Sequence, residues 1–275
     1  MSTQKLTQML INAGIEKNEA FREVEMLMEH FCHIKKQDLI KGVVLTAEQL
    51  NLIEEKVKIR VEKRLPIQYI IGESWFMGEF FKVNSDVLIP RDETELLVTK
   101  AIETIRKNGL NSVLDVGTGS GCIACTIAKR TEATVLGVDI SSDALRIALD
   151  NVTKLGINNR AVFRKSNLFE KVRAEEKFDL IISNPPYIPR GTKLQEEVKH
   201  EPEIALFADE DGLAVYRKII EEAPEFLNNG GYLFFELGID EAEKVKSMMS
   251  EFFSEIVVEK DFAGIDRVIY GKCIK

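Results

Sequence analysis

The stretch Val113-Leu114-Asp115-Val116-Gly117-Thr118-Gly119-Ser120-Gly121 decides the fold of this chain of 275 residues. Its beginning is typical of a buried strand, and the glycines that follow indicate a turn into a helix. In a doubly wound α/β sheet, ligands bind at such a strand-to-helix junction. Glycine tolerates positive φ and lets a ligand approach the main chain without a Cβ in the way. We therefore predict a cofactor site at Gly117, Thr118, Gly119, Ser120 and Gly121.

Strand-like and helix-like segments alternate from Ser112 onward. Alternation of this kind is the pattern of a parallel sheet that is covered by helices on both faces. It predicts a doubly wound, Rossmann-like α/β domain. Two later β-prone runs, 255–258 and 267–270, indicate an antiparallel edge. The apolar runs that we expect to form the parallel strands are 113–116, 134–140, 161–164, 178–183 and 232–237.

The amino-terminal part has a helical pattern. Apolar residues between Leu6 and about Arg64 recur at the spacing that lines one helix face. Between Pro66 and Pro90, short aromatic and β-branched pieces separated by Gly72 and Gly78 indicate a hairpin linker, and Asp92-x-x-Glu95 resembles the capping box of a helix start. We expect a small helical domain at residues 1–72, a hairpin linker at 73–92 and the α/β domain at 93–275.

The composition disfavours several classes of partner. A net charge of -8 argues against a surface that neutralises phosphates, so nucleic acid is disfavoured as a direct substrate. No apolar run is long enough to span a membrane and the amino terminus does not resemble a signal peptide, so we expect a cytoplasmic protein. Cys122 and Cys125 follow a glycine turn and are interpreted as packing residues. His30 and His33 have no third ligand nearby, so no metal is expected.

Two further positions follow strands at the predicted cofactor edge. Asp139 ends the second strand, where a carboxylate can accept hydrogen bonds from both hydroxyls of a ribose. A dinucleotide fingerprint requires glycine where Cys122 stands, which weakens the nicotinamide interpretation. Asn167 and Leu168 follow the third strand. They are expected to offer an amide to the amino group of adenine and an apolar surface to its ring.

The sequence Ser183-Asn184-Pro185-Pro186-Tyr187 follows the fourth strand at the same edge. An amide nitrogen is a poor nucleophile because its lone pair is delocalised into the carbonyl. The Asn184 side-chain oxygen and the Pro185 carbonyl can each accept one N–H of a target amide and hold it near a sulfonium methyl. Such acceptors stabilise the positive charge that grows on the nitrogen during transfer. Pro186 stiffens the loop, and Tyr187 offers a flat face to a planar substrate group.

The chain resembles the peptide chain release factor glutamine N5-methyltransferases, the HemK or PrmC group. The resemblance covers essentially the whole chain. Its motifs here are Pro66-x-Gln68-Tyr69-Ile70-x-Gly72, Leu88-Ile89-Pro90-Arg91-x-Glu93-Thr94-Glu95, the glycine loop, Asn184-Pro185-Pro186-Tyr187, Glu201-Pro202 and Asp211-Gly212-Leu213.

The resemblance implies a helical domain that recognises a release factor and a catalytic domain that uses S-adenosyl-L-methionine. The methyl acceptor would be the glutamine of the Gly-Gly-Gln loop. Asn184, Pro185, Pro186 and Tyr187 would bind that glutamine, with Asn184, Pro185 and Tyr187 catalytic. The glycine loop, Asp139, Asn167, Leu168 and Asn184 would bind the cofactor, and residues 90–91 and 93–95 would form a wall of the same pocket. Asn167 stands where relatives usually have an acid.

Three alternatives remain at this point. A ribosomal-protein glutamine methyltransferase has the same chemistry, and the helical domain does not exclude it. A methyltransferase that acts on exocyclic amines of nucleic acids meets the same geometric problem, but the acidic balance counts against it. A non-catalytic S-adenosylmethionine-binding assembly protein would not need the intact motif at Asn184.

Overall fold

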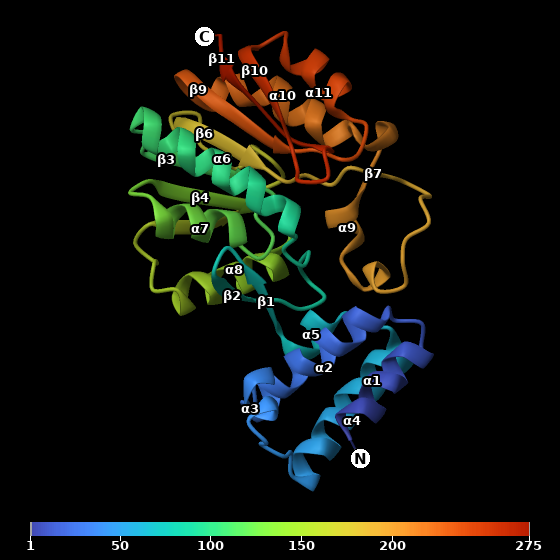
Figure 1. Cartoon of the computed structure of the whole chain (residues 1–275). Helices are drawn as coiled ribbons and strands as arrows, with labels where there is room; N and C mark the ends of the chain where they lie inside the picture. Colours follow the sequence, from blue (N-terminus) through green and yellow to red (C-terminus); the bar gives the residue numbers. More distant parts are fainter. Residues whose placement is uncertain (1, 275) are drawn as a thin grey trace. The chain divides into compact units, whose positions relative to one another are not determined.

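The structure is a computed structural model that describes residues 2–274 (Figure 1). These residues form two compact units. The first contains the chain up to Glu73 together with Leu194–His200, and the second contains Ser74–Lys193 and the chain from Glu201 onward. The segment Leu194–His200 therefore belongs to the first unit although it lies far along the sequence from the rest of it.

The first unit is helical, as its apolar spacing predicted. Leu6 and Leu10 from one helix, Leu27 and Met28 from the next and Val57 from a third are all buried in one core. Thr46 and Gln49 form a capping box at the start of the helix Ala47–Lys63. The helices are α1 (Thr3–Asn12), α2 (Lys17–Cys32), α3 (Lys36–Ile40), α4 (Ala47–Lys63) and α5 (Ile67–Ile71).

The second unit is built on a seven-stranded sheet with the order β10-β11-β9-β6-β3-β4-β5. Pairing is parallel from β9 to β5, whereas β11 pairs antiparallel with both β9 and β10. The Rossmann-like fold and its antiparallel edge are confirmed. The strands are β3 (Ser112–Val116), β4 (Thr134–Asp139), β5 (Ala161–Lys165), β6 (Phe178–Ser183), β9 (Leu227–Glu236), β10 (Phe253–Lys260) and β11 (Asp266–Cys273).

Helices cover both faces of this sheet (Figure 1). Successive strand residues face opposite ways, so Val113 joins one core and Leu114 joins the other. The Val113 core includes residues of α6 (Asp92–Asn108), α7 (Cys122–Arg130) and α8 (Ser142–Lys154). The Leu114 core includes residues of α10 (Ala214–Phe226) and α11 (Ala242–Met249).

Short elements complete the second unit. The predicted hairpin is present as β1 (Glu73–Phe76) and β2 (Glu79–Lys82), and it turns at Met77 and Gly78. A second small sheet pairs β7 (Ile188–Pro189) with β8 (Phe207–Ala208). The other elements are α9 (Glu203–Leu206) and the 3-10 turn η2 (Glu210–Gly212), while the turn η1 (Val198–His200) lies in the first unit.

The predicted capping box at Asp92 and Glu95 is wrong. Helix α6 begins at Asp92 itself, and Arg91 occupies the cap position without a side-chain cap bond. Glu95 instead accepts a hydrogen bond from the Met77 N–H at 2.7 Å. The carboxylate thus ties the hairpin turn to α6, a contact that local sequence spacing does not encode.

Candidate functional site

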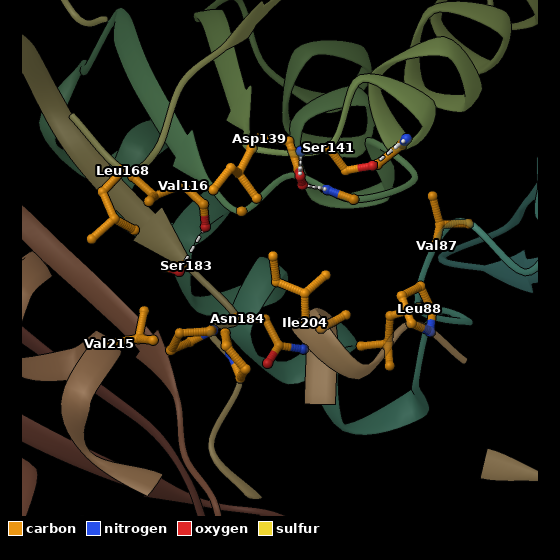
Figure 2. A pocket seen from close by; sticks show the side chains of 18 of the residues that line it. Val87, Leu88, Val116, Asp139, Ser141, Leu168, Ser183, Asn184, Ile204 and Val215 are labelled. Carbon is orange, nitrogen blue, oxygen red and sulfur yellow. Dashed lines mark hydrogen bonds between the residues drawn. The ribbon is translucent and has the colours of Figure 1, made fainter. Parts of the chain in front are cut away.

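A cavity opens at the carboxyl ends of β3, β4, β5 and β6, the edge where the sequence predicted a cofactor site (Figure 2). Most of the predicted site residues lie around it. Its opposite wall comes from residues 86–88 and from Pro202, Ile204 and Ala205 at and before α9. The predicted residues that line the cavity are Gly117, Gly119, Asp139, Asn167, Leu168, Asn184, Pro185 and Pro186.

The glycine loop presents main chain to this cavity. Gly117 and Gly119 have φ of 76° and 54°, and a Cβ added at either would meet no atom within 4 Å. The N–H groups of Gly117 and Thr118 both donate to the Val138 carbonyl, at 2.9 and 3.0 Å, which fixes the turn against β4. A rigid backbone surface without side chains therefore borders open space, as a bound cofactor requires.

The other three residues of the loop do not line the cavity. Thr118 is buried and its hydroxyl donates to Asp115 at 2.6 Å. Ser120 is also buried. A Cβ at Gly121 would lie 3.0 Å from the Phe163 ring, so helix α7 packs closely there. Their direct contact with a cofactor stays a prediction, and their visible contribution is to shape the turn.

Asp139 is held in place by the loops on either side of it. One carboxylate oxygen accepts from the Gly119 N–H and the other from the Ser141 N–H, each at 2.8 Å. Burial raises the pKa of this carboxyl, although the backbone donors oppose the shift. Each oxygen keeps a second lone pair. The carboxylate can therefore accept two further hydrogen bonds from a ligand in the cavity.

Asn167 is also oriented by a neighbour. Its side-chain nitrogen donates to Glu170 at 2.7 Å, so its oxygen is the atom that can accept a hydrogen bond from a ligand. An acid at this position would likewise present an acceptor. The substitution of an amide for the usual acid is therefore compatible with recognition of an exocyclic amino group, and Leu168 adds apolar surface beside it.

Asn184 lies at the end of β6, where the Ser183 hydroxyl donates to the Val116 carbonyl at 2.7 Å and joins β6 to β3. The Asn184 side-chain nitrogen donates to the Thr94 hydroxyl at 3.1 Å. Thr94 in turn donates to a carboxylate oxygen of Glu236 at 2.5 Å. Sequence patterns gave no indication of this chain of contacts, because Thr94 and Glu236 are separated by 142 positions.

Tyr187 does not line the cavity. Its ring packs against the core that includes Tyr216 and Leu237, and burial raises the pKa of its hydroxyl above the usual range. Its carbonyl lies close to Gly212, where an added Cβ would approach to 2.2 Å. Tyr187 therefore anchors the end of the motif, and its contact with a substrate stays a prediction.

The outer wall differs from what the resemblance implied. Residues 90–91 and 93–95 do not line the cavity, whereas 86–88 do. The conformation of this wall is fixed by Glu201, which is buried. Its carboxylate accepts from the Ile89 N–H at 3.1 Å and from the Arg91 guanidinium at 2.5 Å. Arg91 and Glu201 thus hold the segment before α6 to the segment that leads into α9.

Redox chemistry at Cys122 and Cys125 is disfavoured. Both thiols are buried and neither is in a disulfide. Burial raises the pKa of Cys122 to about 12 and that of Cys125 above its usual range. Thiolates are the reactive species, so these side chains are packing residues of α7.

The described residues contain no group of three or more His, Cys, Asp or Glu arranged to hold a metal ion. No helix among residues 2–274 is long and apolar enough to cross a membrane.

Two protein-family models match the chain. The model described as "PrmC N-terminal domain" matches residues 3–72, and the model described as "Methyltransferase small domain" matches residues 92–202. The first covers the helical region, and the second includes the glycine loop and Asn184.

Curated relatives share about two fifths of their residues with this chain, and the three described here are named "Release factor glutamine methyltransferase". The protein of Thermodesulfovibrio yellowstonii is 41% identical over 88% of this chain and 89% of its own length. The Bacillus subtilis protein is 38% identical over 94% and 92%. The Fusobacterium nucleatum protein is 40% identical over 82% of this chain, and the match spans 65% of that longer protein.

Solved structures with the same fold are more distant in sequence. A ribosomal protein L11 methylase of Lactobacillus delbrueckii has a TM-score of 0.51 at 23% identity, covering 66% of this chain and 80% of that one. A 16S rRNA N2 G1207 methyltransferase of Thermus thermophilus, in complex with AdoMet and guanosine, has a TM-score of 0.55 at 19% identity. It covers 73% of this chain and 49% of that one. At this identity the likeness shows the fold alone.

Proposed function

Because the chain belongs to the family of release factor glutamine methyltransferases, we propose that it methylates the side-chain amide nitrogen of a glutamine in peptide chain release factors. The methyl donor is S-adenosyl-L-methionine, and the acceptor is the glutamine of the Gly-Gly-Gln loop. The observation that carries the proposal is the position of Asn184. Its side-chain amide lies at the end of β6 and lines the same cavity as the glycine loop and Asp139.

The residues around the cavity fit the cofactor. Gly117 and Gly119 leave open space where side chains would stand, and the Asp139 carboxylate has lone pairs for two hydroxyls. Asn167 offers an acceptor for an amino group and Leu168 offers apolar surface. When bound, S-adenosyl-L-methionine supplies an electrophilic methyl group on a sulfonium. Recognition of the cofactor is therefore assigned to β3, β4, β5 and the loops that follow them.

The motif at the end of β6 deals with the low nucleophilicity of an amide. Asn184 Oδ1 and the Pro185 carbonyl can each accept one N–H of the substrate glutamine, which holds its nitrogen with one face toward the reacting methyl. These dipoles are fixed before the reaction and favour the positive charge that develops on nitrogen. No general base is needed, because an N-alkylated amide loses its extra proton readily to water.

The charge balance favours a protein substrate over nucleic acid, since the net charge is -8. We propose that the helical residues 1–72 help to recognise the release factor and that the enzyme works in the cytoplasm, where translation takes place. A ribosomal protein is the second candidate substrate. The family name of the relatives favours the release factor.

The test is a methylation assay with labelled S-adenosylmethionine. The protein is incubated separately with a release factor, the same factor with the loop glutamine changed to glutamate, ribosomes and DNA. Label on the unchanged release factor alone is the expected result. Label on ribosomes or DNA without label on the release factor contradicts the proposed substrate.

A further inference from the structure

Behind the cavity, a chain of hydrogen bonds leads from Asn184 into the core of the second unit. The Asn184 nitrogen donates to Thr94 Oγ1 at 3.1 Å, and the Thr94 hydroxyl donates to Glu236 Oε2 at 2.5 Å. Thr94 and Glu236 are 2% and 1% exposed, and neither lines the cavity. Glu236 ends β9 and Thr94 lies in the first turn of α6, so both sit on rigid elements.

The direction of these bonds is set by the charge at the buried end. An ionised carboxylate can only accept hydrogen bonds, so the single proton of the Thr94 hydroxyl must point toward Glu236. Only lone pairs of Thr94 Oγ1 then face Asn184. The Asn184 side chain must therefore turn its NH₂ group toward Thr94 and its oxygen away from it.

This orientation matters because a carboxamide is nearly symmetric in shape. Turned by half a rotation about its last bond, Asn184 would place NH₂ donors where the substrate amide also offers NH₂ donors. Two donors facing each other cannot form a hydrogen bond, and the substrate nitrogen would lose one of its two acceptors.

We propose that Thr94 and Glu236 are positioning residues that hold the Asn184 carboxamide with Oδ1 available to the substrate amide. The inference rests on the proposed function of the site. The two residues touch neither substrate nor cofactor and act through Asn184. We call Asn184, Thr94 and Glu236 the relay. The buried negative charge of Glu236 sets the direction of the two hydrogen bonds, so that Asn184 Oδ1 stays available as an acceptor at the cavity.

Titration of Glu236 gives the relay a pH dependence. Burial raises its pKa to about 7, and the hydrogen bond from Thr94 opposes that shift. Protonated Glu236 can donate to Thr94, which frees the hydroxyl proton to point at Asn184 and removes the constraint. The charged and titratable groups that act on this region from neighbouring elements are Arg91, Glu93, Cys122, Tyr187, Tyr216 and Arg267.

The test compares Glu236→Gln, Thr94→Val and the control Thr94→Ser with the unchanged enzyme, using a release factor and labelled cofactor. In Glu236→Gln the new NH₂ can donate to Thr94, so the direction of the hydrogen bonds is no longer enforced, and in Thr94→Val the hydroxyl is missing. We expect kcat to fall about tenfold in each of these two variants. Thr94→Ser keeps the hydroxyl and is expected to stay within about twofold of the unchanged kcat. Cofactor affinity is expected to change by less than about twofold in all three.

Double variants show whether Thr94 and Glu236 act through Asn184 or affect kcat independently of it. In an Asn184→Ala background, Thr94→Val and Glu236→Gln are expected to cause no further loss of kcat, because the group that they position is gone. The unchanged enzyme should lose kcat as pH falls through about 7, and Glu236→Gln should not show this decline. Additive losses in the Asn184→Ala background, or an unchanged pH profile in Glu236→Gln, overturn the inference.

A measurement that does not depend on catalysis tests the relay separately from the proposed methyltransferase function. In the protein without added cofactor, exchange of the Asn184 side-chain amide protons, followed by NMR, should be slower in the unchanged protein and in Thr94→Ser than in Thr94→Val. Equal exchange rates contradict the relay even if release factors are methylated. Slow exchange in a protein that fails to methylate any release factor contradicts the proposed function and leaves the relay supported.

Discussion

Asn184 makes one contact in the structure and is proposed to make a second, and the two are compatible in only one orientation of its side chain. Its nitrogen is occupied by Thr94, and its oxygen is the acceptor that the proposed substrate amide requires. The Pro185 carbonyl is the second acceptor that we propose for this amide. Because Thr94 and the proposed substrate use both polar atoms of the Asn184 side chain, we expect Asn184 to contribute to turnover much more than to cofactor binding.

Asn184→Ala is therefore expected to leave cofactor affinity nearly intact and to reduce kcat by ~10²-fold or more, as loss of one oriented dipole does in other enzymes. Cofactor affinity is measured by calorimetry and kcat by label transfer to a release factor. Asn167→Ala is the matched control, since it removes the amide that follows β5, which β3 and β4 separate from β6, and should weaken cofactor binding instead. An unchanged kcat in Asn184→Ala would refute its assigned role.

Sequence reasoning identified the side chains that face the cavity better than those behind them. Asp139 ends one predicted strand of a parallel sheet, Asn167 and Asn184 follow two others, and the carboxyl ends of such strands meet at one edge. Thr94 and Glu236 lie 90 and 142 positions from their hydrogen-bond partners Asn184 and Thr94. Such contacts depend on how α6 packs on the sheet, which no local pattern encodes.

At the scale of elements, the segment Leu194–His200 is bound within the helical unit by charged contacts. Arg60 of α4 is 2% exposed and donates both to Glu23 of α2, at 3.0 to 3.1 Å, and to Glu197 of the segment at 2.9 Å. Arg64 also pairs with Glu197, at 2.5 Å. Desolvation raises the pKa of Glu23, while Arg60 opposes the shift. One guanidinium thus joins two helices and the segment.

Removal of Arg60 should be more harmful than removal of Glu197. Arg60→Met leaves the buried Glu23 carboxylate without its partner, a situation that costs about 3–5 kcal/mol of unfolding free energy. Glu197→Gln keeps the Arg60–Glu23 pair and should cost much less. Urea denaturation measures both, and trypsin cleavage after Lys193 or Lys199 reports release of the segment. Equal stability of the two variants would contradict this account of the cluster.

The elements differ in how far their sequences determine them. The strands of the large sheet were predicted because each carries a short apolar run between turn residues, as Val113–Leu114 and Ile181–Ile182 do. Leu194–His200 carries no such run. Its place follows from the pairing of Glu197 with Arg60, 137 positions earlier. Charged pairs at that separation are invisible to periodicity.

At the scale of the whole molecule, the described residues of the second unit include three buried carboxyls whose pKa is raised further than that of the half-buried Asp139. Burial raises the pKa of Asp115, Glu236 and Glu241 to about 7 in each case. Hydrogen bonds from Thr118, from Thr94 and from the Gly238 N–H respectively oppose the shift without cancelling it. The folded protein therefore holds protons that the unfolded chain releases near pH 4.

This difference predicts that the protein becomes less stable as pH rises from about 5 to about 8. In that interval the folded state binds more protons than the unfolded state, so the free energy of unfolding falls with pH. Stability from these groups is complete below their unfolded pKa and is lost as pH passes through about 7. Glu176, whose pKa is lowered to about 2 by Arg164, has the opposite dependence, but only at lower pH.

The measurement is the midpoint of thermal unfolding between pH 5 and pH 8. A loss of only about 2 kcal/mol lowers the midpoint by roughly 5 °C in a protein of this size. Glu241→Gln keeps an oxygen that can accept from the Gly238 N–H but cannot ionise, so its curve should be flatter than that of the unchanged protein. Glu243→Gln, an exposed position in the first turn of the helix that Glu241 precedes, is the matched control and should leave the slope unaltered. A midpoint that rises between pH 6 and pH 8 would contradict this prediction, because that slope requires an unfolded state that binds more protons than the folded state does.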